Sequence, residues 1–380
     1  MRRGRSAQTL SCALAIAFGA ALSTRGQAAP PQAAPPVSKS AELAAHPELT
    51  TVDRELTHAA TRLLEQAHPV EGAAVAVDVR SGEILVWAEL RKGGPKGSLI
   101  TAARAPAASV FKLVTTAALF EAGGVRPNDE VCISGGLKSI ERRHLDAPRG
   151  ERTCAPFSQA LGHSRNAVYA QLATRRLARQ DLIDIAERLG FNTTVPFDWP
   201  VPVGTLKVPY NDLDFARTAA GFQGSTLSPL GGAYLASIIA QGGVARRFHL
   251  ARASGEAPAE DDEGETRVLS AATARRITRM MEVTVHSGTS RLIFNDESGH
   301  SLLPGIRVAG KTGTLRPDSS GETASWFIGF APSQKPEIVV SVMLENGAVW
   351  RQKAAEVARD LLRVYFHRKG AANVVDPLAQ

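Results

Sequence analysis

Alternating apolar and polar residues mark two short segments in the first quarter of the chain, Ala73–Arg80 and Glu83–Ala88, with Ser81-Gly82 between them. A period of two predicts strands, and a Ser-Gly pair between two such runs predicts a tight hairpin turn. A third apolar run, Ile306–Ala309, predicts a strand that continues into Lys311. Strands are therefore expected toward both ends of the chain.

Helical patterns occupy much of the remaining sequence. Within residues 43–66, four apolar residues fall on one helical face: Leu56, Ala60, Leu63 and Leu64. Three further helices are expected, over Leu113–Phe120 with a stop at Gly123-Gly124, from Thr226-Leu227-Ser228-Pro229-Leu230 to Gly242-Gly243, and over Arg351–Phe366. Strands at both ends with helices between them predict a mixed α and β domain.

Three short motifs carry candidate chemistry. Ser109-Val110-Phe111-Lys112 opens the first of these apolar helices, Ser164-Arg165-Asn166 follows, and Lys311-Thr312-Gly313-Thr314 comes last. S-x-x-K, S-x-N and K-T-G in this order are the parts of a serine enzyme that uses lysine where a protease uses histidine. Each motif alone also occurs by chance, for example as an exposed Ser and Lys on a helix. The ordered set of three favours the enzyme.

The spacing of the first motif suits nucleophilic catalysis. Residues i and i+3 of a helix share a face, so Lys112 can place its amine beside the hydroxyl of Ser109. A serine becomes a good nucleophile when a base takes its proton, and lysine is a base only when neutral. The pKa of Lys112 must therefore fall by about three units from ~10.4, which costs ~4 kcal/mol. Apolar burial lowers a lysine pKa, and so does a second cation, for which Lys311 is the candidate.

With these motifs, the chain resembles the transpeptidase domain of penicillin-binding proteins, within the penicillin-binding and serine β-lactamase superfamily. The resemblance runs from about Pro69 to Arg368. Besides the hairpin at Ser81-Gly82, it rests on Thr226-Leu227-Ser228-Pro229-Leu230, Ser287-Gly288-Thr289 and Trp326-Phe327-Ile328-Gly329-Phe330-Ala331-Pro332. The resemblance implies an α/β sandwich (α+β): an antiparallel sheet flanked by helices, with a mainly helical subdomain. The nucleophile would lie in the cleft between the two.

The resemblance also implies four catalytic roles. Ser109 would be the nucleophile that forms an acyl-enzyme, and Lys112 would be its general base. Ser164 would relay protons between Lys112 and the leaving amine, and Lys311 would set the local electrostatic potential.

Substrate binding falls to the neighbouring positions. Asn166 would hydrogen-bond both the bound acyl chain and Lys112, and Thr312, Gly313 and Thr314 would bind the terminal carboxylate of a peptide. The backbone N–H groups of Ser109 and Thr314 would form the oxyanion hole, since an edge strand could run beside the start of the helix.

The implied function is D,D-transpeptidation of peptidoglycan stem peptides. The resemblance also implies that the protein binds β-lactams covalently. The cell-wall synthesis machinery is a candidate partner. The enzymatic alternatives are a D,D-carboxypeptidase and a serine β-lactamase. Residues 189–210 lack the Arg-x-x-x-Glu pattern of one lactamase class, and Ser164-Arg165-Asn166 stands where others have S-x-V or a tyrosine. A penicillin sensor or degenerate binding module is disfavoured because nucleophile, base and K-T-G are intact. These motifs do not distinguish transpeptidase from carboxypeptidase, which differ in whether an amine or water attacks.

Composition narrows the choice of partners. A chain of 380 residues with 44% hydrophobic residues can bury the core of one large domain or two modest ones. The formal charge of +7 comes mainly from scattered arginines, and neither stacking aromatics nor a recognition helix accompanies them, so nucleic acid is excluded as a partner. No Cys/His cluster has metal-ligand spacing, and neither a metal nor a cofactor is expected. Residues 254–265 are acidic and rich in glycine and alanine, so a surface loop is expected there.

The N-terminal residues predict export. A basic segment, Met1-Arg2-Arg3-Gly4-Arg5, precedes an apolar run from Leu10 to Leu22, and small residues near Gly26-Gln27-Ala28 provide a cleavage point. The apolar run is shorter than the ~20 residues of a membrane span. We expect a secretory signal and a periplasmic or otherwise extracytoplasmic protein. The alternative is an uncleaved inner-membrane anchor, the one case in which a membrane would be a partner.

Four segments follow from these assignments. They are a signal peptide over residues 1–28, a linker and lead-in helix over 29–68, the penicillin-binding transpeptidase domain over 69–368, and a tail over 369–380.

Export changes the interpretation of two cysteines. Cys132 and Cys154 flank a polar insertion before Ser164, and they are the cysteines left once the signal is removed. In an oxidising compartment a disulfide is favoured over a metal site, and closing a loop of this length would contribute ~3 kcal/mol. The alternative is two free thiols.

Overall fold

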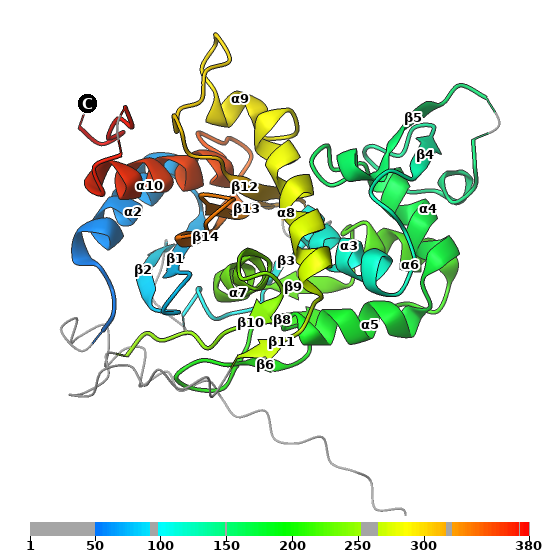
Figure 1. The fold of residues 1–380 in the computed structure, drawn as a ribbon, viewed down its shortest axis with the longest axis horizontal. Helices are drawn as coiled ribbons and strands as arrows, with labels where there is room; N and C mark the ends of the chain where they lie inside the picture. Colours follow the sequence, from blue (N-terminus) through cyan, green and yellow to red (C-terminus); the bar gives the residue numbers. More distant parts are fainter. Residues whose placement is uncertain are drawn as a thin grey trace, which may run out of the picture. The chain divides into compact units, whose positions relative to one another are not determined.

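A five-stranded antiparallel sheet organises the fold, in the strand order β12-β13-β14-β1-β2 (Figure 1). The computed structural model describes residues 50–91, 98–148, 150–251, 265–316, 321–371 and 373–379. The five strands are β1 (Glu71–Asp78), β2 (Ile84–Arg91), β12 (Ala309–Leu315), β13 (Thr323–Ala331) and β14 (Ile338–Asn346). Strands from the two ends of the domain meet where Glu71 lies opposite Glu345. The expected antiparallel sheet built from both ends is therefore confirmed.

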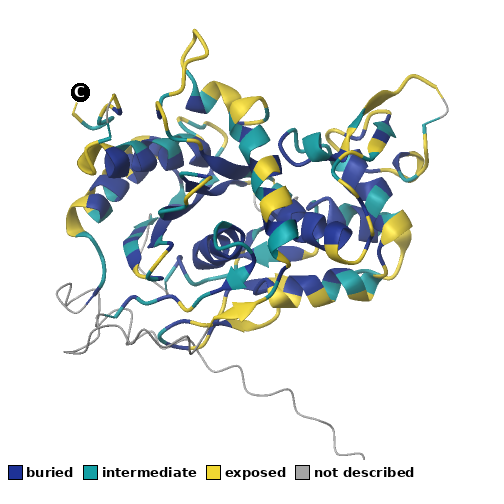
Figure 2. Cartoon of the chain, viewed as in Figure 1, coloured by how far each residue is buried: buried dark blue, intermediate teal, exposed yellow. Residues whose placement is uncertain are grey.

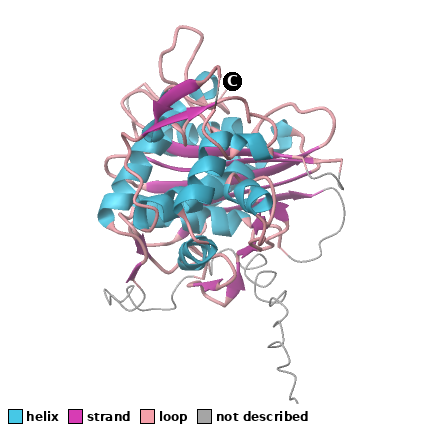
Figure 3. Ribbon diagram, turned by 90° about the vertical axis from the view of Figure 1, so that its right-hand side faces the viewer, coloured by secondary structure: helices cyan, strands magenta, loops and turns pink. Residues whose placement is uncertain are grey.

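Different helices cover the two faces of this sheet (Figures 1 and 3). On the outer face, α2 (Arg54–Ala67) and α10 (Ala354–Arg368) pack against each other and on the strands. On the inner face, α7 (Pro229–Ala240) packs on β1, β13 and β14, while α8 (Ala271–His286) contacts β12. Side chains alternate along a strand, so β1 supplies both cores: Ala73, Val75 and Val77 to one, Ala74 and Ala76 to the other.

Local sequence explains where the covering helices begin and how closely they approach. Asp53 caps α2 by accepting from the Leu56 N–H at 2.9 Å, and the predicted stripe of α2 is buried. Ser228 caps α7 in the same way, with a proline at the first helical position. At Gly232 a Cβ would lie 2.5 Å from the Ser341 Oγ, so the glycine allows α7 to approach β14 closely.

A mainly helical region lies beside the inner face. Its helices are α3 (Lys112–Glu121), α4 (Asn166–Arg176), α5 (Arg179–Arg188) and α6 (Asp212–Ala219). The short α9 (Arg291–Phe294) instead packs with α8 and α10, and its Phe294 belongs to the core of the outer face. The small ladders of the helical region are β3 (Ala105–Pro106) with β9 (Ser225–Leu227) and β8 (Gly204–Leu206), β4 (Glu130–Ile133) with β5 (Thr153–Pro156), β6 (Thr194–Val195) with β7 (Val201–Pro202), and β10 (Val244–Ala245) with β11 (Thr266–Arg267). Figure 2 shows buried positions concentrated on the sheet and on the inward sides of the helices around it.

Two expectations concern residues outside this description. The signal peptide and the linker precede residue 50, and the acidic loop falls almost entirely within residues 252–264. Among the described helices, none combines the length and the apolarity needed to cross a membrane.

Candidate active site

The backbone turns sharply just before Ser109. This residue lies in a single turn of 3₁₀ helix, η2 (Ala108–Phe111), which leads directly into α3. Ala108 has a φ of 50°, in the left-handed region that residues with a side chain rarely occupy. Gly221, itself at φ +80°, packs on this turn, where a Cβ would lie only 2.1 Å from the Ala108 carbonyl oxygen. The turn that presents Ser109 is thus held from outside by a position that accepts glycine alone.

Lys112 is fully buried at the start of α3, one turn after Ser109. Its Nζ lies 2.8 Å from the Ser109 Oγ and 2.6 Å from the Ala220 carbonyl oxygen. The amine also lies 5.7 Å from the centre of the Tyr169 ring. Burial, and then the nearby Lys311, hold the pKa of Lys112 well below its ordinary value of 10.5. A neutral amine here can donate to Ala220 and accept the proton of Ser109, which is what a general base requires.

Ser164 links the nucleophile to the second lysine. It lies before α4 with a φ of 51°, and its Oγ is 3.0 Å from the Ser109 Oγ. The buried Nζ of Lys311 donates to the Ser164 Oγ at 3.3 Å and to the Thr312 carbonyl oxygen at 2.8 Å. Burial lowers the pKa of Lys311 to about 7. Hydrogen bonds therefore run without a break from Lys311 through Ser164 and Ser109 to Lys112.

The edge strand β12 presents different residues on its two faces. Lys311 and Gly313 face the nucleophile turn, where a Cβ at Gly313 would lie 3.3 Å from the Ala108 Cβ. Thr312 and Thr314 alternate with them and so face the other way, and the Thr312 Oγ1 lies 2.7 Å from the Thr289 Oγ1. The strand packs directly on η2. This packing brings the K-T-G segment beside Ser109.

Asn166, the first residue of α4, has a different partner from the expected one. Its carboxamide nitrogen donates to the Leu137 carbonyl oxygen at 2.6 Å. The expected hydrogen bond to Lys112 is not what the structure shows, because the Lys112 amine bonds to Ser109 and Ala220. Asn166 still lines the cleft, where a ligand could reach its side chain.

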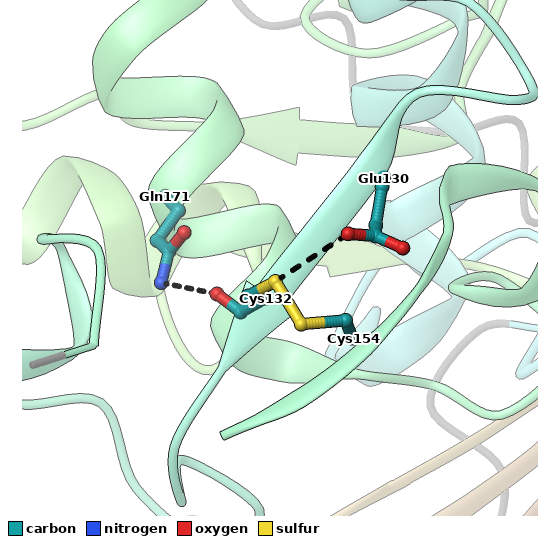
Figure 4. Close-up of a disulfide and its surroundings, with 4 residues drawn as sticks. All are labelled: Glu130, Cys132, Cys154 and Gln171. Atoms are coloured by element: carbon teal, nitrogen blue, oxygen red, sulfur yellow. Dashed lines mark hydrogen bonds between the residues drawn. A yellow bond between two sulfur atoms is a disulfide. The ribbon is translucent and has the colours of Figure 1, made fainter. Parts of the chain in front are cut away.

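Leu137 belongs to the segment between β4 and β5. A disulfide between Cys132 and Cys154 joins these two strands (Figure 4). Cys132 lies opposite Cys154 in this ladder, with their Sγ atoms 2.05 Å apart. The Gln171 side chain on α4 donates to the Cys132 carbonyl oxygen at 3.4 Å. The hairpin is thereby attached to the helix that carries Asn166.

A cleft of about 380 Å³ opens at the nucleophile. Its lining comprises Ser109, Leu137, His163, Ser164, Asn166, Thr289, Ile293, Thr312, Thr314, Ser325, Trp326, Lys353 and Ala355. Most of these side chains are hydroxyl-bearing or apolar. Burial and the neighbouring Arg165 lower the pKa of His163, which keeps its imidazole neutral at pH 7. The cleft brings together Ser109, Ser164, Asn166, Thr312 and Thr314 of the predicted site.

Sequence reasoning missed several contributors. The Ala220 carbonyl has no side-chain signature, although Gly221 after it indicates an unusual backbone. Leu137 likewise acts through a backbone oxygen. Thr289 is part of the Ser287-Gly288-Thr289 motif, which gives its side chain no role, but its hydroxyl hydrogen-bonds with that of Thr312. Lys353 lies outside every motif, so no pattern could have placed it in the cleft.

A buried lysine base on a serine hydroxyl, a second serine in the same hydrogen-bond chain and a hydroxyl-rich edge strand define an active-site serine enzyme of the acyl-transfer class. Comparison with known proteins agrees with this class. The profile of the penicillin binding protein transpeptidase domain matches residues 72–363. The chain therefore belongs to the penicillin-binding protein transpeptidase family, as its motifs predicted, and is a serine-type enzyme of that family.

The relatives share modest identity over most of the chain. Peptidoglycan D,D-transpeptidase PbpA of Mycobacterium tuberculosis is 26% identical over 342 residues, which cover 79% of this chain and 67% of that protein. Stage V sporulation protein D of Bacillus subtilis is 24% identical over 78% of this chain and 48% of its own length. An imipenem acyl-enzyme complex of penicillin-binding protein A from M. tuberculosis has a TM-score of 0.66 at 22% identity, over 83% of this chain and 79% of that one. This similarity confirms the fold.

Proposed function

We propose that this protein is an exported D,D-transpeptidase that cross-links D-Ala-D-Ala stem peptides of peptidoglycan and is acylated by penicillins at Ser109. The hydrogen-bond chain from Lys311 through Ser164 and Ser109 to Lys112 carries this proposal. The proposal is supported because a lysine of lowered pKa lies on the Ser109 hydroxyl and a second hydroxyl lies beside it.

Acylation uses each member of the chain. Lys112 takes the hydroxyl proton as the Ser109 Oγ forms a bond to the carbonyl carbon of the substrate. The Ser109 and Thr314 backbone N–H groups stabilise the oxyanion. When the carbon–nitrogen bond breaks, the departing amine takes a proton from Ser164, and the proton held by Lys112 restores that hydroxyl. With a β-lactam the departing nitrogen stays tethered to the acyl group.

In the second half-reaction an amine of a neighbouring stem attacks the ester carbon. A carbon–nitrogen bond forms, the bond to the Ser109 Oγ breaks, and the serine regains a proton from the attacking amine through Lys112. Asn166 holds the acyl chain, while Thr312, Gly313 and Thr314 bind the terminal carboxylate of the donor peptide before its last residue departs. The edge position of β12 supports this role, since a peptide can lie along it.

The cell compartment is part of the proposal. Residues 1–28 would direct export, and the mature protein would begin near Ala29, followed by the lead-in segment and the transpeptidase domain over 69–368. In an oxidising compartment Cys132 and Cys154 would be fully oxidised, consistent with their positions opposite each other. The substrate, peptidoglycan, lies in that compartment.

The test uses the purified mature protein and a fluorescent penicillin. We expect stoichiometric, slowly released labelling, with the adduct on the peptide containing Ser109 and none on the Ser109→Ala variant. Rapid release would indicate a β-lactamase, and an adduct at another residue would contradict the site. A stem pentapeptide should then yield an exchange product with an added D-amino acid, whereas hydrolysis alone would favour the carboxypeptidase.

A further inference from the structure

The cleft continues past the K-T-G strand to the start of α10. Ser325, Lys353 and Ala355 line this part. Ser325 lies opposite Thr314 in the β12–β13 ladder, and its Oγ accepts from the Ala354 N–H at 3.2 Å. The first turn of α10 is therefore fixed one strand away from the outermost threonine of the motif.

The residues of this part of the cleft share one face of the sheet. Lys311 and Gly313 point inward, so Thr312 and Thr314 point outward. Ser325 also points outward, because it bonds to α10, which packs on the outer face. The threonines proposed to bind a carboxylate and the side chain of Lys353 thus lie on the same side of β12.

Lys353 is held at its backbone and free at its side chain. Its N–H donates to the Glu356 carboxylate at 2.7 Å, which fixes the Cα position. The residue is exposed, and within the described part of the chain its ammonium group has no hydrogen bond or ion pair. Lys353 is also the one lysine or arginine among the described residues that line the cleft.

The other nearby cation is already engaged. The Lys311 Nζ donates to Ser164 and to the Thr312 carbonyl oxygen within the buried chain. Because burial lowers its pKa to about 7, Lys311 carries only part of a positive charge at neutral pH. A carboxylate bound at Thr312 and Thr314 would therefore gain from a charged donor on the solvent side.

We infer that Lys353 binds the free carboxylate of the substrate, and of β-lactams, together with Thr312 and Thr314, and so selects ligands with an anionic terminus. This inference rests on the proposed function, since it assigns a further residue to that site. The ligand class is an acyl donor with a carboxylate next to the scissile amide. Neutral acyl donors would lose this contact.

A matched ligand pair isolates the contact: benzylpenicillin, which has the carboxylate, and its methyl ester, which does not. The second-order rate constant for acylation of Ser109 is measured with both, for the wild type, Lys353→Met, Lys353→Arg and the control Lys335→Met. Lys335 is also an exposed lysine, but it lies beyond the opposite end of β13. The ratio of the acid rate to the ester rate should fall about tenfold in Lys353→Met. Lys353→Arg should retain most of it, and Lys335→Met all of it.

The outcomes distinguish failure of the role of Lys353 from failure of the proposed function. An unchanged ratio in Lys353→Met, or an equal fall in Lys335→Met, would overturn the role of Lys353 while acylation of the wild type still supports the proposed function. If neither ligand acylates the wild type, the proposed function itself fails. Since each ratio is taken within one protein, a general loss of folded protein cancels, and melting curves of the four proteins verify this.

Discussion

The strongest test of the proposed base is a stability measurement. Lys112→Met keeps an unbranched side chain of similar length in the same buried site but removes the amine. In the unfolded chain the lysine binds a proton up to a pH near 10.5, whereas in the folded protein its pKa is well below that value. Between these two pKa values the unfolded state binds more protons. The wild type should therefore gain stability as the pH rises through this window, and the variant should lack that gain.

Two opposing terms set the size of the effect. At pH 7.5 the lysine of the unfolded chain is protonated, so keeping the folded amine neutral costs the wild type ~4 kcal/mol, from the roughly three pH units between 7.5 and 10.5. The variant avoids this cost but leaves the Ala220 carbonyl without its donor, which costs ~1–3 kcal/mol. Lys112→Met should therefore be more stable than the wild type by ~1–3 kcal/mol at pH 7.5. At pH 10 the deprotonation cost falls below ~1 kcal/mol, so the variant should become the less stable protein.

Urea unfolding at pH 7.5 and at pH 10, with the disulfide kept intact, measures both differences. Lys311 is present in both proteins, so its own titration cancels to first order. Lys335→Met is the matched control, and its exposed side chain should give a small difference that does not change with pH. If Lys112→Met loses the same stability at both pH values, the lysine is protonated in the folded protein and cannot be the resting base.

Three further expectations follow from the same geometry. Lys112→Arg should slow acylation by ~10² to 10⁴-fold because guanidinium stays protonated, and Lys311→Arg should slow it less. The reverse order of the two stopped-flow acylation rates would show that Lys112 is not the base. Mature protein should show no titratable thiol when unfolded without reductant, and reduction should lower its free energy of unfolding by ~3 kcal/mol; one free thiol per cysteine would refute the disulfide. Gly221→Ala should destabilise the protein by more than ~2 kcal/mol and slow acylation. The control Gly124→Ala is also strained, at φ +62°, but it has open space around it and should not affect acylation. Equal acylation rates in the two variants would show that the Ala108 turn does not depend on the packing of Gly221.

Periodicity and local turn chemistry predicted much of the architecture. The hairpin at Ser81-Gly82, the buried stripe of α2 and the Ser228-capped α7 were each visible as short-range patterns, which depend on neighbours a few residues apart. That strands from both ends of the chain share one antiparallel sheet came from the family resemblance. The pairing of β1 with β14 was not predicted, because no local pattern specifies which distant strand completes a sheet.

The active site was predictable where side chains define it and not where the backbone does. Ser109 and Lys112 meet because of their spacing along one turn. The left-handed conformations of Ala108 and Ser164 arise from packing around them, and alanine or serine at these positions gives no local signal. The Ala220 carbonyl was invisible for the same reason: any residue type supplies a carbonyl oxygen.

The strand order of the central sheet also has a consequence for biosynthesis. β1 and β2 emerge first from a translating ribosome or a translocation pore, but the strand that flanks β1 on its other side, β14, is among the last elements made. Until then one edge of the nascent hairpin is unpaired, and such edges invite pairing with other chains. Lys311 also arrives late, in β12 shortly before β13 and β14, so a half-emerged chain has the nucleophile without its complete hydrogen-bond chain. The proposed penicillin reactivity would then appear only when nearly the whole polypeptide has been delivered and folded, and labelling would report completed chains.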